Sequence, residues 1–208
     1  MTVRLCAMLL ALVAALCGCS LSRPPLVKQT YLLEAARVPE TAAPAIDATL
    51  RVGMFPVAPP FAAKQMVYRS DTHRYDADFY NEYFVAPRDM ITQRVFEWMQ
   101  NARVFRTTLL ASTEGPRNAL TLSGLVTEMY GDLRDPQQPA AVLSIQFYVT
   151  RPTRGDDSVL LAQQLRQAVP IEDASAAALA RGLSSALSDL LAEFENQVRG
   201  AKLVDTAN

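Results

Sequence analysis

The chain has 208 residues, half of them apolar, and 20 basic residues stand against 21 acidic ones, for a formal charge of -1. This composition is typical of a globular protein and excludes a disordered chain, a collagen and a coiled-coil rod. A protein that binds nucleic acid would carry an excess of Lys and Arg, so we expect no nucleic acid partner.

The first 18 residues have the pattern of a secretory signal peptide. Arg4 and the free amine precede an apolar run of 12 residues from Leu5 to Leu16, which is shorter than the ~20 residues of a membrane-spanning helix. The run ends in Leu16-Cys17-Gly18-Cys19, which resembles the bacterial lipobox, where the last Cys receives a diacylglycerol and becomes the first mature residue. We therefore predict a signal peptide over residues 1–18 and lipidation of Cys19.

The positions of the cysteines agree with this interpretation. The chain has three, Cys6, Cys17 and Cys19, and none lies in the 189 residues that follow, so the mature chain has no disulfide framework. A simple signal peptide with a free thiol at Cys19 is the alternative. Fatty chains on Cys19 would anchor the protein stably, and Ser20 in place of an Asp resembles the sorting signal for the outer membrane.

A tether is predicted over residues 19–30, because Ser20 to Thr30 contains a Pro-Pro pair and few bulky apolar residues. Its 11 residues could extend ~35–40 Å. The mature chain has 19 basic and 21 acidic residues, a formal charge of -2, and no polybasic stretch for anionic lipids. Residues 201–208 are predicted to form a flexible tail.

The first half of the folded chain is predicted to contain short strands and one helix. Met90, Val95 and Trp98 share a stripe at helical spacing behind Pro87, which suits a first helical turn. Residues 38–46 form a Pro/Ala-rich connector. The expected elements are strands at Tyr31–Leu33, Leu50–Val57, Met66–Arg69, His73–Tyr75 and Val104–Thr107 and a helix at Pro87–Asn101.

The second half contains the clearest β-strand pattern. From Ala141 to Thr150 apolar and polar residues alternate, and Leu120–Tyr130 and Leu160–Val169 flank this run as further strands of a meander. Asp173–Arg199 is predicted to be an amphipathic helix, capped by Asp173 or Ser175. We therefore predict one α+β domain over residues 31–200, with two layers: a mostly antiparallel sheet (β-meander) covered by two helices.

Residues that could carry catalysis are scarce. His73 is the one histidine, and we interpret it as a surface or packing residue of a hairpin rather than a binding or pH-sensing residue. The sequence has no phosphate-binding Gly-rich loop and no Gly-x-Ser-x-Gly elbow. The carboxylates fall in turns and at a helix start, where solvation and capping explain them, although a glycosidase with a pair of catalytic carboxylates stays an open alternative. We expect no enzyme activity, cofactor or metal.

Six of the 16 aromatic residues lie between Tyr68 and Phe84. Such a density indicates either core packing or a protein interface, where Tyr, Phe and Arg are enriched. The candidate partner-interface residues are Tyr68, Arg69, Tyr75, Phe79, Tyr80, Tyr83 and Phe84. Under the interface hypothesis, replacing Tyr80 and Tyr83 with Ala weakens assembly and leaves the melting temperature nearly unchanged.

The chain resembles the ABC-type transport auxiliary lipoprotein family, which includes the lipoprotein of the paraquat-inducible operon. The resemblance rests on the lipobox, on this order of elements and on short motifs such as Tyr31-Leu32-Leu33, Leu50-Arg51-Val52 and Met66-Val67-Tyr68-Arg69. The resemblance covers about residues 30 to 200. One departure is that Tyr83-Phe84 stands where a Trp is expected.

The resemblance implies a non-catalytic docking subunit of an MCE-type ABC lipid transport system, anchored on the periplasmic face of the outer membrane. Its partner would be the periplasmic MCE-domain protein, contacted by several copies of this chain around a pore axis, which implies a homo-oligomer. Two alternatives stay open. One is a periplasmic lipid-binding chaperone with a cleft between helix and sheet; the other is a lipoprotein regulator of a cell-wall synthase, which the short tether disfavours.

Overall fold

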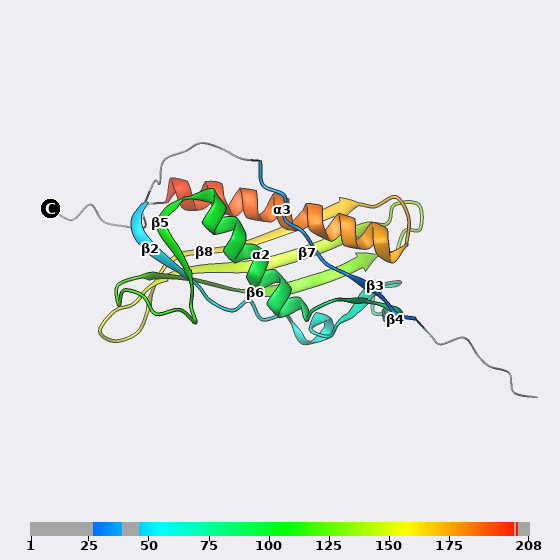
Figure 1. Ribbon diagram of the computed structural model, residues 1–208. Coiled ribbons are helices and arrows are strands. Elements are labelled where there is room, and N and C mark those ends of the chain that lie inside the picture. Colours follow the sequence, from blue (N-terminus) through cyan, green and yellow to red (C-terminus); the bar gives the residue numbers. More distant parts are fainter. Residues whose placement is uncertain (1–26, 39–45, 202, 204–208) are drawn as a thin grey trace, which may run out of the picture.

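The computed structural model describes residues 27–38, 46–201 and 203. The predicted signal peptide, the predicted lipidation site Cys19 and most of the predicted tether lie outside these residues. Figure 1 shows the arrangement of the elements, which in chain order are β1 (Gln29–Tyr31), β2 (Ile46–Val52), a 3-10 turn η1 (Pro59–Phe61), β3 (Gln65–Arg69), β4 (Tyr75–Tyr83), α2 (Pro87–Ala102), β5 (Phe105–Leu110), β6 (Leu120–Asp132), β7 (Ala140–Arg151), β8 (Ser158–Pro170) and α3 (Ala176–Gly200).

The three longest strands form the meander that the sequence predicts. Strand β7 pairs antiparallel with β6 on one side and with β8 on the other, along almost its whole length. Alternation places Leu143, Ile145 and Phe147 on the buried face. The α+β prediction of one sheet with two helices is confirmed.

The free edge of β6 is shared by two groups of strands, which gives the sheet a fork. The start of β6 pairs parallel with β2, which in turn pairs parallel with β5. The end of β6 pairs parallel with β3, and β3, β4 and β1 continue the sheet there. Between the two groups Val57 bridges to Val126. The fork separates the β1–β3–β4 end of the molecule from the β2–β5 end.

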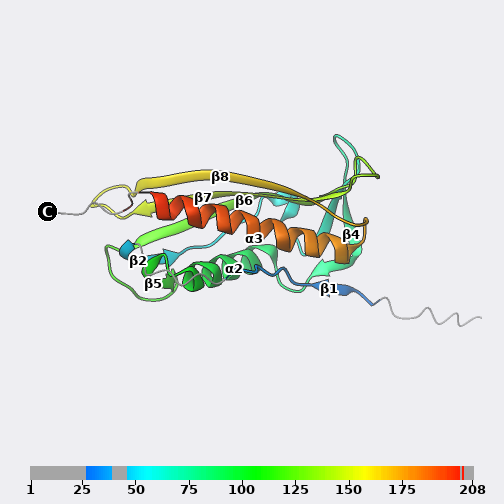
Figure 2. The same ribbon diagram turned by 90° about the horizontal axis from the view of Figure 1, so that it is seen from above.

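Both helices cover one side of the curved sheet, as Figure 2 shows. Helix α3 packs on the meander and α2 packs on β2 and β5. The Ser175 hydroxyl caps α3 by accepting a hydrogen bond from the Ala178 amide at 3.2 Å. A Cβ on Gly182 would lie 2.5 Å from Ile171 and 2.6 Å from Ala141. Glycine therefore allows α3 to approach β7 closely.

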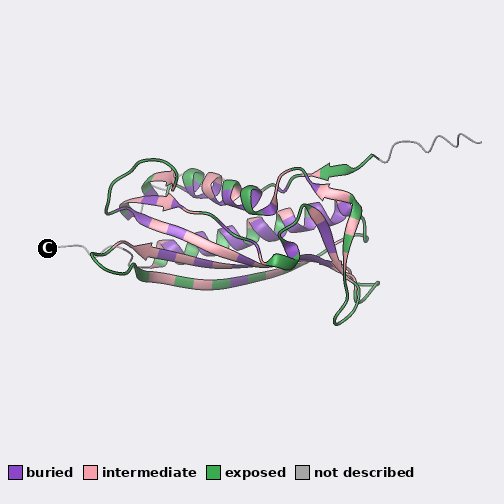
Figure 3. Ribbon diagram, turned by 90° about the horizontal axis from the view of Figure 1, so that it is seen from below, coloured by how far each residue is buried: buried purple, intermediate pink, exposed green. Residues whose placement is uncertain are grey.

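The core fills the space between these two layers, and the buried stripes of the strands are visible in Figure 3. Phe147 stacks on Phe194 of α3 with ring centroids 4.3 Å apart, and Phe55 contacts the Phe147 ring edge-on. Phe55 fits because Gly124 has no side chain: a Cβ there would lie 2.4 Å from the Phe55 ring. Aromatic packing of this kind fixes the position of α3 on the sheet.

Residues 32–38 cross the two helices as an extended strap. The Ser184 and Ser188 hydroxyls of α3 accept hydrogen bonds from the amides of Glu34 and Ala36. The Arg37 guanidinium then donates two hydrogen bonds to the buried Glu195 carboxylate, at 2.9 and 2.7 Å. The strap joins the N-terminal part of the domain to α3.

Several predicted boundaries need correction. The predicted tether ends too late, because Gln29 and Thr30 already belong to β1. Strand β2 begins at Ile46, inside the predicted connector, and β4 extends to Tyr83 instead of ending at Tyr75. Leu203, placed in the predicted flexible tail, is buried, and its carbonyl accepts a hydrogen bond from Arg151 at 2.6 Å.

Candidate docking surface

The seven aromatic and arginine residues singled out from the sequence lie on or next to β3 and β4, but they face in different directions. A Cβ on Gly131 would contact Tyr68 and Leu179 of α3, so Tyr68 faces the helix side of the sheet. Its neighbour Arg69 and the cross-strand partner Tyr75 therefore lie on the outer face, opposite the helices.

Three aromatic rings form a cluster on the outer face. Phe61 stacks on Tyr130 with centroids 5.7 Å apart, and Tyr75 meets the edges of both at 6.0 and 5.6 Å. Phe61 and Tyr130 are buried under this packing, whereas Tyr75 remains exposed. The cluster presents one tyrosine ring to solvent on a rigid base.

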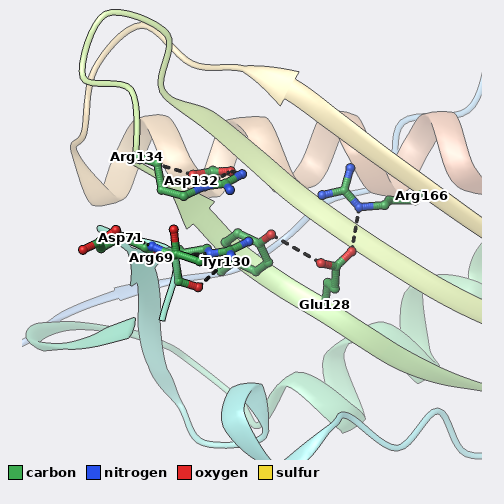
Figure 4. Close-up of polar contacts among 8 residues, drawn as sticks. Arg69, Asp71, Glu128, Tyr130, Asp132, Arg134 and Arg166 are labelled. Carbon is green, nitrogen blue, oxygen red and sulfur yellow. Dashed lines mark hydrogen bonds and ion pairs between the residues drawn. The ribbon is translucent and has the colours of Figure 1, made fainter. Parts of the chain in front are cut away.

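Three arginine side chains, Arg69, Arg134 and Arg166, lie around Tyr130 of the aromatic cluster, as Figure 4 shows. Arg69 lies over the Tyr75 ring at 5.5 Å and donates to the carbonyls of Asp71 and Thr72 at 3.3 and 2.8 Å, which holds the β3–β4 turn. Arg134 pairs with Asp132 at 2.6 Å in the next turn. We name Arg69, Tyr75, Arg134 and Arg166 the outer arginine face.

Arg166, the fourth member of this face, is held in place by a row of side chains across the meander. Glu128 on β6 and Arg166 on β8 both lie opposite Ser144 on β7. Because Ser144 is small, the Arg166 guanidinium reaches across it to the Glu128 carboxylate at 2.7 Å. The Tyr130 hydroxyl donates to the same carboxylate at 3.3 Å, so the aromatic cluster and the arginines form one network.

The electrostatics keep these groups ionised. The hydrogen bond from Arg134 lowers the pKa of Asp132, and the charges of Arg134 and Arg69 contribute in the same direction. The hydrogen bond to Glu128 raises the pKa of Arg166. Cations on the rim and an aromatic centre are the composition of a protein-docking surface.

Phe79 and Tyr80 project from a bulge in β4. The β3–β4 register shifts between Gln65 opposite Glu82 and Val67 opposite Ala77, which places extra residues on β4. The Asp78 carboxylate stabilises the bulge by accepting hydrogen bonds from the amides of Tyr80 and Asn81 at 2.8 and 3.0 Å. Phe79, Tyr80 and the following Phe84 are all exposed.

Tyr83 is a core residue, which corrects its assignment to a contact surface. Only 2% of its surface is exposed, and its hydroxyl has no hydrogen-bond partner among the described residues. Burial, together with the nearby Tyr68, raises the pKa of this hydroxyl. Tyr83 therefore supports the hairpin from inside and cannot contact a partner directly.

Tyr68 lines a groove of about 600 Å³ between the β1–β3–β4 end of the sheet and the start of α3. Burial first, then the charges of Asp78 and Tyr31, raise the pKa of Tyr68 to about 12. The groove is lined by two phenols, two carboxylates, other polar side chains and small apolar ones. Its lining residues are Gln29, Tyr31, Tyr68, Ser70, Asp76, Asp78, Asn81, Leu133 and Ala174–Ala177.

Of the residues that meet at this candidate surface, the sequence singles out Arg69 and Tyr75 but not Tyr130, Arg134 and Arg166. These three lie 55 or more residues further along the chain than Tyr75 and join the cluster through the parallel pairing of β3 with β6. Local pattern contains no signal for such a pairing. His73 lies exposed in the β3–β4 turn.

Comparison with known proteins identifies the family. The sequence profile of the ABC-type transport auxiliary lipoprotein component matches residues 31–194, and the chain belongs to this family. Protein XCC0632 from Xanthomonas campestris, a DUF330 family structure, has 17% identity and a TM-score of 0.71, covering 83% of this chain and 96% of its own.

A second crystal structure, described as an uncharacterized protein, has 14% identity and a TM-score of 0.65 over 83% of this chain and 99% of its own. At these identities the two structures support the fold alone. No sequence match was found among curated proteins. Among the described residues, no helix is both long and apolar enough to cross a membrane.

Proposed function

We propose that this protein is a non-catalytic, lipid-anchored subunit that docks the periplasmic MCE-domain protein of an ABC-type lipid transport system at the outer membrane. The observation that carries the proposal is membership of the transport auxiliary lipoprotein family over residues 31–194, which covers nearly the whole folded domain. The lipobox-like sequence at Leu16 to Cys19 supplies the anchor. Several copies around the partner's axis would form the complete docking platform.

The anchor is tested by incorporation of labelled palmitate into the full chain. Two or more fatty chains bind a membrane far more stably than one, so wild-type protein should take up label and remain in the outer-membrane fraction. A Cys19→Ser variant should do neither. Retention of that variant in the membrane fraction would contradict the anchoring proposal.

The outer arginine face is the proposed contact with the MCE-domain protein. It combines the exposed Tyr75 ring with three guanidinium groups, and aromatic and Arg side chains dominate the energetics of protein interfaces. Phe61 and Tyr130 pack beneath Tyr75, so the surface does not need to reorganise on docking. This arrangement lowers the entropic cost of binding.

Two charge reversals test this contact. Arg134 and Arg181 are both exposed and each pairs with one carboxylate, at 2.6 and 3.0 Å, but Arg181 lies on α3. Exposed ion pairs contribute at most about 1 kcal/mol, so both variants should fold. Arg134→Glu should weaken capture of the MCE-domain protein by at least ~10-fold, whereas Arg181→Glu should not. Equal capture by both variants would place the contact elsewhere.

A lipid-binding function is the second candidate, and the groove beside Tyr68 favours it. A volume of about 600 Å³ lies within the range of small-molecule sites, roughly 300–1,000 Å³. Native mass spectrometry of the purified protein tests this function. A bound phospholipid that is lost on replacing Ala176 with Leu would support it, and a lipid-free spectrum would exclude it.

A further inference from the structure

Exposed hydrophobic side chains gather along one edge of the sheet. Nine large hydrophobic residues are exposed among the described residues, and five of them lie on or beside β1 and the paired part of β4. Single exposed hydrophobics are normal, but a contiguous group marks an interaction site. We name this group the β1–β4 edge; its members are Val27, Leu32, Phe79, Tyr80 and Phe84.

The short pairing of β1 with β4 brings these exposed side chains to one edge of the sheet. The Phe79 and Tyr80 rings contact each other edge-on, with centroids 5.4 Å apart, and the Lys28 ammonium lies 5.7 Å from the Phe79 ring. The Phe84 amide donates to the Tyr31 carbonyl at 2.8 Å, directly before Leu32. The exposed side chains therefore flank the short ladder of Gln29–Tyr31 with Asn81–Tyr83 at its two ends.

The position of the edge relative to the proposed anchor indicates its partner. Val27 follows Cys19 by eight residues, which span at most ~28 Å when fully extended. Strand β1 lies at the β3–β4 end of the molecule, away from β2 and β5 (Figure 2). Once Cys19 carries its fatty chains, a point that rests on the proposed function, the β1–β4 edge is the part of the domain tied most closely to the membrane.

We propose that the β1–β4 edge lies against the phospholipid surface and inserts Phe79, Tyr80 and Phe84 into its headgroup region. Aromatic side chains are enriched at that depth of a bilayer. This orientation leaves the outer arginine face free for the protein partner. It also gives the anchored domain a fixed orientation instead of free rotation about its tether.

The charges of the edge indicate that the contact depends on apolar burial. Lys28 pairs with Glu82 at 2.8 Å, and the Asp78 carboxylate is occupied by the amides of the bulge. Lys64 donates to the Phe84 carbonyl at 2.7 Å. With two cations against two carboxylates, the edge has no excess charge that would attract anionic lipid. Binding should therefore be nearly independent of salt.

A fluorescent label at position 80 tests the proposal. The full chain is lipidated, reconstituted into phosphatidylcholine vesicles with or without phosphatidylglycerol, and recovered by flotation. Tyr80→Cys carries the label, and Val159→Cys is the matched control, because the two residues are 55% and 57% exposed. Val159 lies opposite Thr150, which pairs with Thr121 beside β2, so it is at the other end of the sheet.

The emission of the label at position 80 should shift to shorter wavelength and be quenched by brominated lipid, with or without phosphatidylglycerol. A label in Phe84→Cys should behave in the same way. The label at position 159 should remain unquenched. Flotation with no quenching at positions 80 and 84 would overturn this proposal and leave the anchor intact. Protection of position 80 only on addition of the MCE-domain protein would assign the edge to protein docking. Failure to float would overturn the anchor and this proposal together.

Discussion

Tyr80 and Tyr83 illustrate how residues three positions apart on one strand can have opposite roles. Tyr80 projects from the β4 bulge, whereas Tyr83 is buried in the core. Tyr83→Ala should lower the free energy of unfolding by about 3–5 kcal/mol, as truncation of a buried aromatic residue does. Tyr80→Ala should change it by less than about 0.5 kcal/mol.

Urea unfolding of the two variants measures this difference, with Tyr83→Phe as the control. The wild-type Tyr83 hydroxyl has no hydrogen-bond partner among the described residues, so its removal should leave the free energy of unfolding unchanged or slightly higher. Equal effects of the two alanine variants would contradict the assignment of Tyr83 to the core.

The pair of tyrosines also shows what the sequence could reveal at this scale. The density of aromatic residues directed the interface prediction to β3 and β4, but it did not show which side chains face solvent. Strict alternation would place Tyr75 and Tyr83 on the same face. The bulge held by Asp78 breaks that alternation, and its effect depends on a hydrogen bond that no pattern in the sequence predicts.

Glu195 is the buried charge on which the strap depends. Its carboxylate accepts hydrogen bonds from Arg37, from Arg199 and from the Trp98 indole at 3.0 Å. Glu195→Gln replaces an anion by a neutral amide beside two guanidinium groups, and should cost about 3 kcal/mol of stability. Glu97→Gln, in the partly exposed pair with Arg94, should cost less than about 1 kcal/mol. Similar losses in the two variants would contradict this role of Glu195.

The same carboxylate makes stability depend on pH. Burial alone would raise the pKa of Glu195, but the hydrogen bonds from Arg37 and Arg199 outweigh it and lower the pKa. Its stabilisation is therefore complete above the ordinary glutamate pKa of the unfolded chain and is lost as pH falls through the lower folded-state value. The difference in free energy of unfolding between wild type and Glu195→Gln should become smaller over that acidic range. A difference that stays constant with pH would exclude a lowered pKa for Glu195.

At the scale of elements, the contact of α3 with β7 depends on Gly182. Gly182→Ala would place a methyl group 2.5 Å from the Ile171 side chain, so the helix must move outward. The variant should lose about 2 kcal/mol, although alanine favours a helix by ~1 kcal/mol over glycine. Gly200→Ala on the same helix has open space around its Cβ and should be neutral or stabilising. Thermal unfolding distinguishes the two, and a stabilised Gly182→Ala would contradict the close packing.

The elements themselves differ in how far the sequence could predict them. The meander and both helices have strong periodicity, so their positions were predicted to within a few residues. Most of β4 was missed because Asp76, Asp78, Asn81 and Glu82 resemble loop residues, although they lie on a strand that pairs on both sides. The parallel pairs of β6 join distant segments, which periodicity cannot detect.

At the scale of the whole molecule, the proposed contacts divide the surface into two working regions at the same end. The β1–β4 edge is directed to the lipid, and the outer arginine face is directed to the protein partner. The turns that border this face, between β3 and β4 and between β6 and β7, project together beyond the sheet (Figures 2 and 3). A subunit with this layout would hold a partner at the membrane in one orientation.

Docking on an MCE-domain protein can be measured by copurification from solubilised outer membranes. The lipidated full chain should retain a stoichiometric MCE-domain protein, identified by mass spectrometry, and Arg134→Glu should release it while Arg181→Glu retains it. A wild-type protein that elutes as a monomer without any envelope partner would rule out the docking function.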